Sequence, residues 1–115
     1  MTMQKPIVKS KDAPDLGVFS WSDPFYLEQQ LSEEERMLRD ASKTFAQEKL
    51  QPRITKAFQN ETVEPQIFRE MGEMGLLGTT IPEEYGGLGA GYVSYGVVAK
   101  EIESVDSGYR SMMSV

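Results

Sequence analysis

Two side chains near the end of the chain, Arg110 and Ser114, lie four positions apart. If a helix begins near Ser107, this spacing puts both on one face, with Arg110 in the first turn. There the guanidinium fork and the free N–H groups of a helix start can point at one place, which suits a carboxylate or phosphate on a ligand. The alternative is a surface arginine paired with a nearby carboxylate such as Glu103. Spacing alone favours that alternative, because such pairs are common.

The composition excludes several kinds of catalytic site. The 115 residues include no cysteine and no histidine, which removes thiol nucleophiles, imidazole catalysis, disulfides and Cys/His zinc sites. No Asp/Asn-rich loop predicts an all-carboxylate metal site. The formal charge is −6, from 18 acidic and 12 basic side chains. That balance argues against nucleic acid as the main partner, because phosphate binding needs a net basic face.

The length and patterning predict one domain after an N-terminal arm. Residues 1–18 mix lysines, aspartates and prolines without a long apolar run, so we expect a disordered arm and neither a signal peptide nor a transit peptide. No apolar stretch approaches the roughly 20 residues of a membrane helix. We therefore expect a cytoplasmic protein whose ordered domain covers residues 19–115 and does not bind a membrane.

Two helix starts are predicted close together. Asp23 followed by Pro24 is typical of a cap and a first helical position, and it predicts a short helix ending near Leu31. Ser32 and Glu35 form a capping box, in which each side chain can reach the backbone of the other residue. The box predicts a longer helix, and the run of acidic residues in its first turn suits the helix dipole.

A stripe of apolar residues at helical spacing follows this box, so one face of the helix should be buried. Pro52 predicts a stop or a kink just before it. The expected buried stripe before the proline is Met37, Leu38, Ala41, Phe45, Ala46 and Leu50. A second helical piece after it would carry Ile54, Ala57 and Phe58.

Three further segments complete the predicted fold. Pro65 opens a helix that Gly75 or Gly78 ends, and its expected stripe is Ile67, Phe68, Met71 and Met74. Residues 76–90 predict a glycine-rich loop. It fails the dinucleotide fingerprint, because Tyr92 stands where the third glycine belongs and no strand precedes the run. Residues 92–105 predict a helix. No segment shows strand alternation, so the predicted architecture is all-α with four or five helices.

The last eleven residues resemble the acyl-CoA dehydrogenase family, and within it the glutaryl-CoA dehydrogenases, through the run Val105-Asp-Ser-Gly-Tyr-Arg-Ser-Met-Met-Ser-Val115. The resemblance extends from about Phe19 to the last residue. Three other stretches agree in order and spacing: Leu31-Ser-Glu-Glu-Glu-Arg-Met37, Phe68-Arg-Glu-Met-Gly-Glu-Met-Gly-Leu-Leu-Gly78 and Ile81-Pro-Glu-Glu-Tyr-Gly-Gly-Leu-Gly89. Pro-Glu-Glu-Tyr-Gly-Gly is general to the superfamily, whereas Ser-Gly-Tyr-Arg-Ser points to a dicarboxylic acyl-CoA.

The resemblance implies roles for four residues in substrate binding. In these enzymes an arginine and a serine one helical turn apart neutralise the distal carboxylate of the substrate, and they map onto Arg110 and Ser114. A glutamate that orients the arginine maps onto Glu103, and Ser111 is expected to line the acyl channel. The base that removes the α-proton belongs to a C-terminal domain that this chain lacks, so we expect no catalytic residue here.

The resemblance also implies the setting of the domain. The complete enzyme would have an N-terminal helical, a middle β and a C-terminal helical domain, and this chain matches only the first, as though cut within its last helix. It would use FAD, convert glutaryl-CoA to crotonyl-CoA and carbon dioxide, pass electrons to electron transfer flavoprotein and form a homotetramer. The 115 residues alone should be inactive and flavin-free. Two alternatives stay open, namely an enzyme for another acyl-CoA and a short interaction module that binds a partner through its Met and aromatic face.

Overall fold

The computed structural model describes residues 19–114, so the expected disordered arm lies outside the described residues. The chain divides into two compact units, Met1–Leu31 and Ser32–Val115. The described part of the first unit holds one 3₁₀ helix, η1 (Glu28–Gln30). No helix in residues 19–114 is both long enough and apolar enough to cross a membrane.

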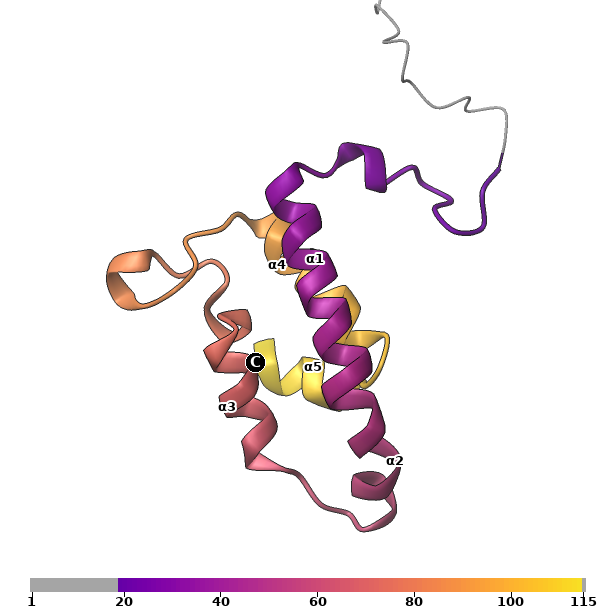
Figure 1. Ribbon diagram of the computed structural model, residues 1–115, viewed down its shortest axis with the longest axis vertical. Coiled ribbons are helices and arrows are strands. Elements are labelled where there is room, and N and C mark those ends of the chain that lie inside the picture. The colour runs from indigo at the N-terminus through magenta and orange to yellow at the C-terminus, as the bar shows by residue number, and fades with distance from the viewer. Residues whose placement is uncertain (1–18, 115) are drawn as a thin grey trace, which may run out of the picture. The chain divides into compact units, whose positions relative to one another are not determined.

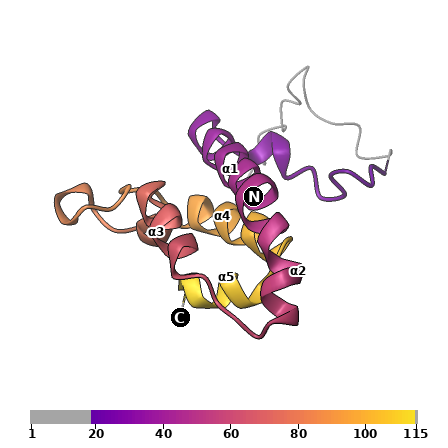
Figure 2. The same ribbon diagram turned by 60° about the horizontal axis from the view of Figure 1, so that its bottom comes forward.

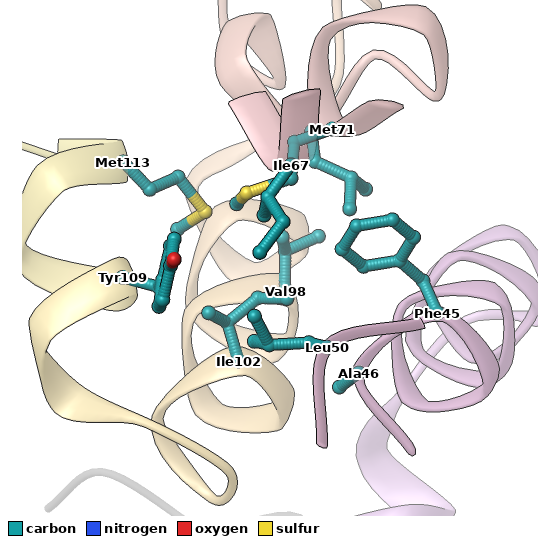
Figure 3. Packing of buried hydrophobic residues seen from close by; sticks show 10 residues of the cluster. Phe45, Ala46, Leu50, Ile67, Met71, Val98, Ile102, Tyr109 and Met113 are labelled. Carbon is teal, nitrogen blue, oxygen red and sulfur yellow. The ribbon is translucent and has the colours of Figure 1, made fainter. Parts of the chain in front are cut away.

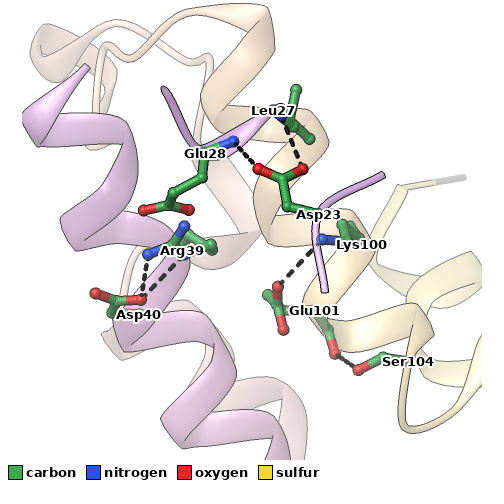
Figure 4. A network of polar contacts seen from close by, with 8 residues as sticks. All are labelled: Asp23, Leu27, Glu28, Arg39, Asp40, Lys100, Glu101 and Ser104. Carbon is green, nitrogen blue, oxygen red and sulfur yellow. Dashed lines mark hydrogen bonds and ion pairs between the residues drawn. The ribbon is translucent and has the colours of Figure 1, made fainter. Parts of the chain in front are cut away.

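The helix expected after Asp23 is wrong. The Asp23 carboxylate does cap a turn, accepting hydrogen bonds from the N–H groups of Leu27 at 2.8 Å and Glu28 at 2.9 Å (Figure 4). However, Tyr26 has a φ of 51°, in the left-handed region that a right-handed helix cannot include. The chain therefore turns after Pro24 and forms only the short η1.

The second unit is all-α, as expected, with no strand among its described residues (Figure 1). Its α-helices are α1 (Glu33–Phe45), α2 (Gln51–Gln59), α3 (Pro65–Glu73), α4 (Tyr92–Glu103) and α5 (Ser107–Ser114). A π-helical turn, η2 (Ala46–Leu50), joins α1 to α2, and two 3₁₀ turns, η3 (Leu76–Gly78) and η4 (Glu83–Tyr85), lie between α3 and α4. Helix α5 lies between α2 and α3 (Figures 1 and 2).

The start of α1 at Ser32 and the junction between α1 and α2 near Pro52 each have a local cause. The capping box at the start of α1 is confirmed, with the Glu35 N–H donating to Ser32 Oγ at 3.2 Å and the Ser32 N–H donating to Glu35 Oε2 at 2.8 Å. Pro52 lacks an N–H and its ring crowds the preceding turn. The helical path nevertheless continues to Gln59, because the π-helical turn η2 widens the backbone just before the proline.

The buried face of α1 and α2 differs from the expected stripe. Met37 is 66% exposed and Phe58 is 84% exposed, and Ala41 is exposed as well. Ser42 is fully buried instead, where its hydroxyl donates to the Leu38 carbonyl at 2.8 Å. A polar residue can take that place on the helix because its one donor bonds within its own turn.

The core joins α1, α3, α4 and α5 of the second unit (Figure 3), and the partly buried Ile54 of α2 packs against it. Its α3 members, Ile67 and Met71, belong to the predicted stripe, but Met74 of that stripe is 38% exposed because it lies past the last turn of α3. Helix α5 contributes two members, and Figure 3 shows Met113 extending toward Ile67, with the ring of Tyr109 on the same side of α5. The buried cluster consists of Phe45, Ala46, Leu50, Ile67, Met71, Leu76, Val98, Ile102, Tyr109 and Met113.

The loop between α3 and α4 is confirmed and is closed by backbone hydrogen bonds. Gly75 ends α3 with a φ of 76°. The N–H of Leu88 donates to the Gly78 carbonyl at 3.0 Å, and the N–H of Gly89 donates to the Ile81 carbonyl at 2.8 Å. This pairing brings the backbone of Gly87 against Ile81 so closely that a Cβ at residue 87 would collide with the Ile81 carbonyl oxygen.

Replacing the capping serine should weaken α1. We expect Ser32→Ala to lower the free energy of unfolding by about 1 kcal/mol, because the N–H of Glu35 loses its acceptor. Urea unfolding followed by circular dichroism measures the change. The matched control is Ser107→Ala, an exposed serine at a helix start whose side chain has no hydrogen bond within residues 19–114. Equal loss in both variants would contradict the capping role.

A methyl group at residue 87 should open the loop. We expect Gly87→Ala to lower the free energy of unfolding by about 1–3 kcal/mol, the usual cost of forcing atoms into filled space. Gly96→Ala is the matched control, because a Cβ there meets nothing within 4 Å and alanine is the better helix former by up to about 1 kcal/mol. The same urea titration should therefore move in opposite directions for the two variants.

Candidate functional site

The candidate site is built on α5, which begins at Ser107 as predicted. The cap is Asp106, whose carboxylate accepts from the N–H of Tyr109 at 2.8 Å and whose carbonyl accepts from the N–H of Arg110 at 3.2 Å. A short turn separates this cap from the end of α4, since the N–H groups of Val105 and Asp106 both donate to the Ile102 carbonyl at 3.0 Å. The turn reverses the chain and lays α5 against α4.

Helix α5 carries two neighbouring stripes with different tasks. Tyr109 and Met113 are four positions apart and buried, at 6% and 9% exposed. Arg110 and Ser114 follow each by one position and are half-buried. Because one residue advances a helix by about 100°, docking the first stripe in the core fixes the direction of the second.

The structure brings three of the four predicted residues together. Arg110 Nε donates to Glu103 Oε2 at 2.6 Å, and Arg110 Nη1 donates to Ser114 Oγ at 3.1 Å. The Ser114 hydroxyl in turn donates to the Arg110 carbonyl at 3.2 Å. The fourth residue, Ser111, is half-buried on the same helix and has no hydrogen bond within residues 19–114.

The arrangement holds the guanidinium from two sides and leaves a third edge open. Nη2 of Arg110 has no hydrogen bond among the described residues, and the side chain is 34% exposed. A planar guanidinium can bind a carboxylate through paired N–H groups. The ion pair with Glu103, 46% exposed, adds only about 0–1 kcal/mol to stability, because solvent screens it. Its main effect is to fix the direction of the fork.

Glu101 and Glu103 lie on different faces of α4, as the sequence predicts. Glu101 is 8% exposed, and its Oε1 is 3.9 Å from the Lys100 ammonium. Its carbonyl accepts from the Ser104 hydroxyl at 2.7 Å (Figure 4). The spacing of the two glutamates places them on different faces of α4, but it does not show which face packs against the core. The burial of Glu101 was therefore not predicted.

A second feature that the sequence did not reveal is a hollow of about 680 Å³ between α1 and α3. Phe45, Ala41 and Met74 supply apolar lining. The charged residues around it are Asp40, Glu48, Lys49, Glu70 and Glu73. Within residues 19–114 no cluster of acidic side chains is arranged to hold a metal ion, so the hollow has acidic walls without the geometry of a metal site.

Comparison with known proteins identifies the domain. Residues 32–115 match the model of the acyl-CoA dehydrogenase N-terminal domain. A probable acyl-CoA dehydrogenase of Bacillus subtilis is 37% identical over 73 residues, which are 64% of this chain and 19% of that protein. The short/branched chain specific acyl-CoA dehydrogenase of Bos taurus mitochondria is 32% identical over 98 residues, which are 85% of this chain and 23% of that protein.

A solved structure agrees with this fold. The crystal structure of glutaryl-CoA dehydrogenase from Mycobacterium smegmatis superimposes with a TM-score of 0.74 at 35% identity, over 82% of this chain and 24% of that one. The chain thus spans about a fifth to a quarter of the length of these relatives. Since the family model covers most of the chain and the helical architecture agrees, this chain belongs to the acyl-CoA dehydrogenase family, and residues 32–115 correspond to its N-terminal helical domain.

Proposed function

We propose that this chain supplies distal-carboxylate recognition to an FAD-dependent glutaryl-CoA dehydrogenase. The observation that carries the proposal is the group formed by Arg110, Ser114 and Glu103 on one side of α5. Membership of the family accounts for an acyl-CoA substrate, and this group gives the reason to choose a dicarboxylic one.

The charge requirement of the substrate supports the assignment. A glutaryl group ends in a carboxylate, and burying it without a partner would be costly. Arg110 can supply the opposite charge through its open Nη2 edge, and the hydroxyl of Ser114 lies beside it. Glu103 orients the guanidinium and moderates its field, so that the site attracts a carboxylate without holding it too tightly. Ser111 lines the acyl channel in this proposal.

The proposed reaction removes two electrons and two protons from glutaryl-CoA and then releases carbon dioxide to give crotonyl-CoA. When bound in the complete enzyme, FAD would supply the acceptor for these electrons and electron transfer flavoprotein would receive them from it, in a cytoplasmic homotetramer. None of the residues of this chain is assigned as the base for the α-proton. The domain would cover residues 19–115, followed by a middle β and a C-terminal helical domain.

The flavin does not fit the hollow between α1 and α3. FAD carries a pyrophosphate, which binds to basic side chains or free N–H groups. The hollow between α1 and α3 presents four carboxylates and one ammonium. That donor set repels a pyrophosphate, so we assign no FAD-binding residue and no chemical step to these side chains.

One observation favours an alternative substrate. The bond of 2.6 Å between Arg110 and Glu103 already gives the guanidinium a partner, as it would in a dehydrogenase of a monocarboxylic acyl-CoA. A substrate that is oxidised without decarboxylation is the other alternative, and this bond does not distinguish it. The interaction-module alternative has less support, because Tyr109 and Met113 of its Met and aromatic face are buried in the core of the domain itself, and on α5 only Met112 of that face remains exposed, at 51%.

Truncating the arginine separates the two substrate assignments. In the complete enzyme we expect Arg110→Ala to raise KM for glutaryl-CoA by about 10- to 1,000-fold, because the buried distal carboxylate loses its partner. Steady-state assays with glutaryl-CoA and with pentanoyl-CoA, a monocarboxylic substrate of the same chain length, measure the effect. Pentanoyl-CoA should keep its KM.

The matched control is Arg69→Ala, an exposed arginine on α3 with no ion pair among the described residues, which should leave both substrates unaffected. Equal loss on glutaryl-CoA and pentanoyl-CoA in Arg110→Ala would reject the carboxylate assignment. It would leave the monocarboxylic alternative in place.

A further inference from the structure

Tyr109 connects α5 to the start of α3. Its hydroxyl oxygen accepts a hydrogen bond from the backbone N–H of Glu64 at 3.3 Å. Its ring lies against Phe68, with 5.8 Å between ring centroids and an angle of 33° between the planes. The side chain of Tyr109 thus contacts the backbone of a residue 45 positions earlier in the chain. This contact links the first turn of α5 to the start of α3.

Helix α5 cannot set its own direction. With eight residues it is too short to be stable by itself and depends on docking. Its two buried side chains are Tyr109 and Met113. Met113 is an unbranched apolar side chain that adapts to several packings, whereas Tyr109 adds a directional hydrogen bond. Among the buried contacts of α5, Tyr109 therefore supplies the directional one that restricts rotation of the helix about its axis.

Glu64, the donor of this hydrogen bond, has a further contact through its side chain. The Glu64 carboxylate lies 3.7 Å from Arg53 Nη1, and Arg53 Nη2 donates to Glu70 Oε1 at 3.2 Å. Arg53 belongs to α2 and Glu70 to α3. The pair of Arg53 with Glu64 is weak, because the Glu64 side chain is 49% exposed. The N–H that Tyr109 binds serves as a reference point for α5 because it belongs to the residue directly before α3, and Arg53 links that helix to α2 through Glu70.

We propose that Tyr109 is a positioning residue for substrate selection, its hydroxyl setting the rotation of α5 and hence the direction of Arg110 and Ser114. The proposal rests on the proposed function, because it assigns a consequence to the carboxylate site. Tyr109 touches no substrate atom in this scheme. It acts on Arg110, the next residue along the same helical turn.

The test is Tyr109→Phe in the complete enzyme, a change that keeps the ring in the core and removes only the acceptor. We expect KM for glutaryl-CoA to rise by about 2- to 10-fold, the range expected for one hydrogen bond. The kcat for glutaryl-CoA and both constants for pentanoyl-CoA should stay within about twofold. The matched control is Tyr92→Phe, the same chemical change at a side chain that is 86% exposed, which should alter neither substrate.

A second pair of variants tests the donor. Glu64→Pro removes the N–H that Tyr109 accepts from, at a residue whose φ of −92° must shift toward the roughly −65° of proline. It should reproduce the selective rise in KM. Glu64→Ala keeps the N–H and removes only the carboxylate, so its KM for glutaryl-CoA should stay near that of the unmodified enzyme.

The outcomes separate this inference from the function on which it rests. If Arg110→Ala selectively impairs glutaryl-CoA but Tyr109→Phe leaves its KM unchanged, the positioning role is wrong and the carboxylate site stands. If Tyr109→Phe impairs both substrates equally and lowers the thermal midpoint, Tyr109 only stabilises the fold and the inference is overturned. If Arg110→Ala itself affects both substrates equally, the proposed function fails first.

Discussion

The docking of α5 in the core is the constraint on which the candidate site depends. The helix is short, and two of its side chains, Tyr109 and Met113, pass into the apolar cluster that α1, α3 and α4 share. Burial of such side chains is worth roughly 1.5–3 kcal/mol each, enough to outweigh the poor stability of an isolated two-turn helix. The polar stripe next to them is held in place by that packing, and its own hydrogen bonds then refine its geometry.

Within this stripe the arginine meets two competing demands. A guanidinium that must receive a carboxylate needs an open edge, but a long flexible side chain loses entropy when it is fixed. Glu103 and Ser114 fix Arg110 in advance from opposite sides, at 2.6 Å and 3.1 Å. Glu103 also lowers the net positive charge of the site. It therefore orients the guanidinium of Arg110 but weakens the attraction of the site for an anionic ligand.

The helix starts and the glycine-rich loop were predictable because their signals are local. The capping box at Ser32, the proline that opens α3 and the glycine after that helix each act within one turn of backbone. The helix expected after Asp23 failed although its cap is present, because the left-handed conformation of Tyr26 stops propagation. Periodicity also misplaced Met37 on the buried face, since a stripe that includes two alanines and a methionine leaves the rotation of α1 loosely defined.

The sequence by itself determined that the chain is helical, where α5 begins, and that Arg110 and Ser114 share a face, because helix geometry fixes the spacing of i and i+4. It left open whether Glu103 reaches Arg110, since seven residues and a reversal of the chain separate them. Only the tertiary structure decided that contact, through the turn after Ile102 that lays α5 along α4. It likewise decided that Tyr109 meets the backbone of Glu64, because no local rule relates residues 45 positions apart.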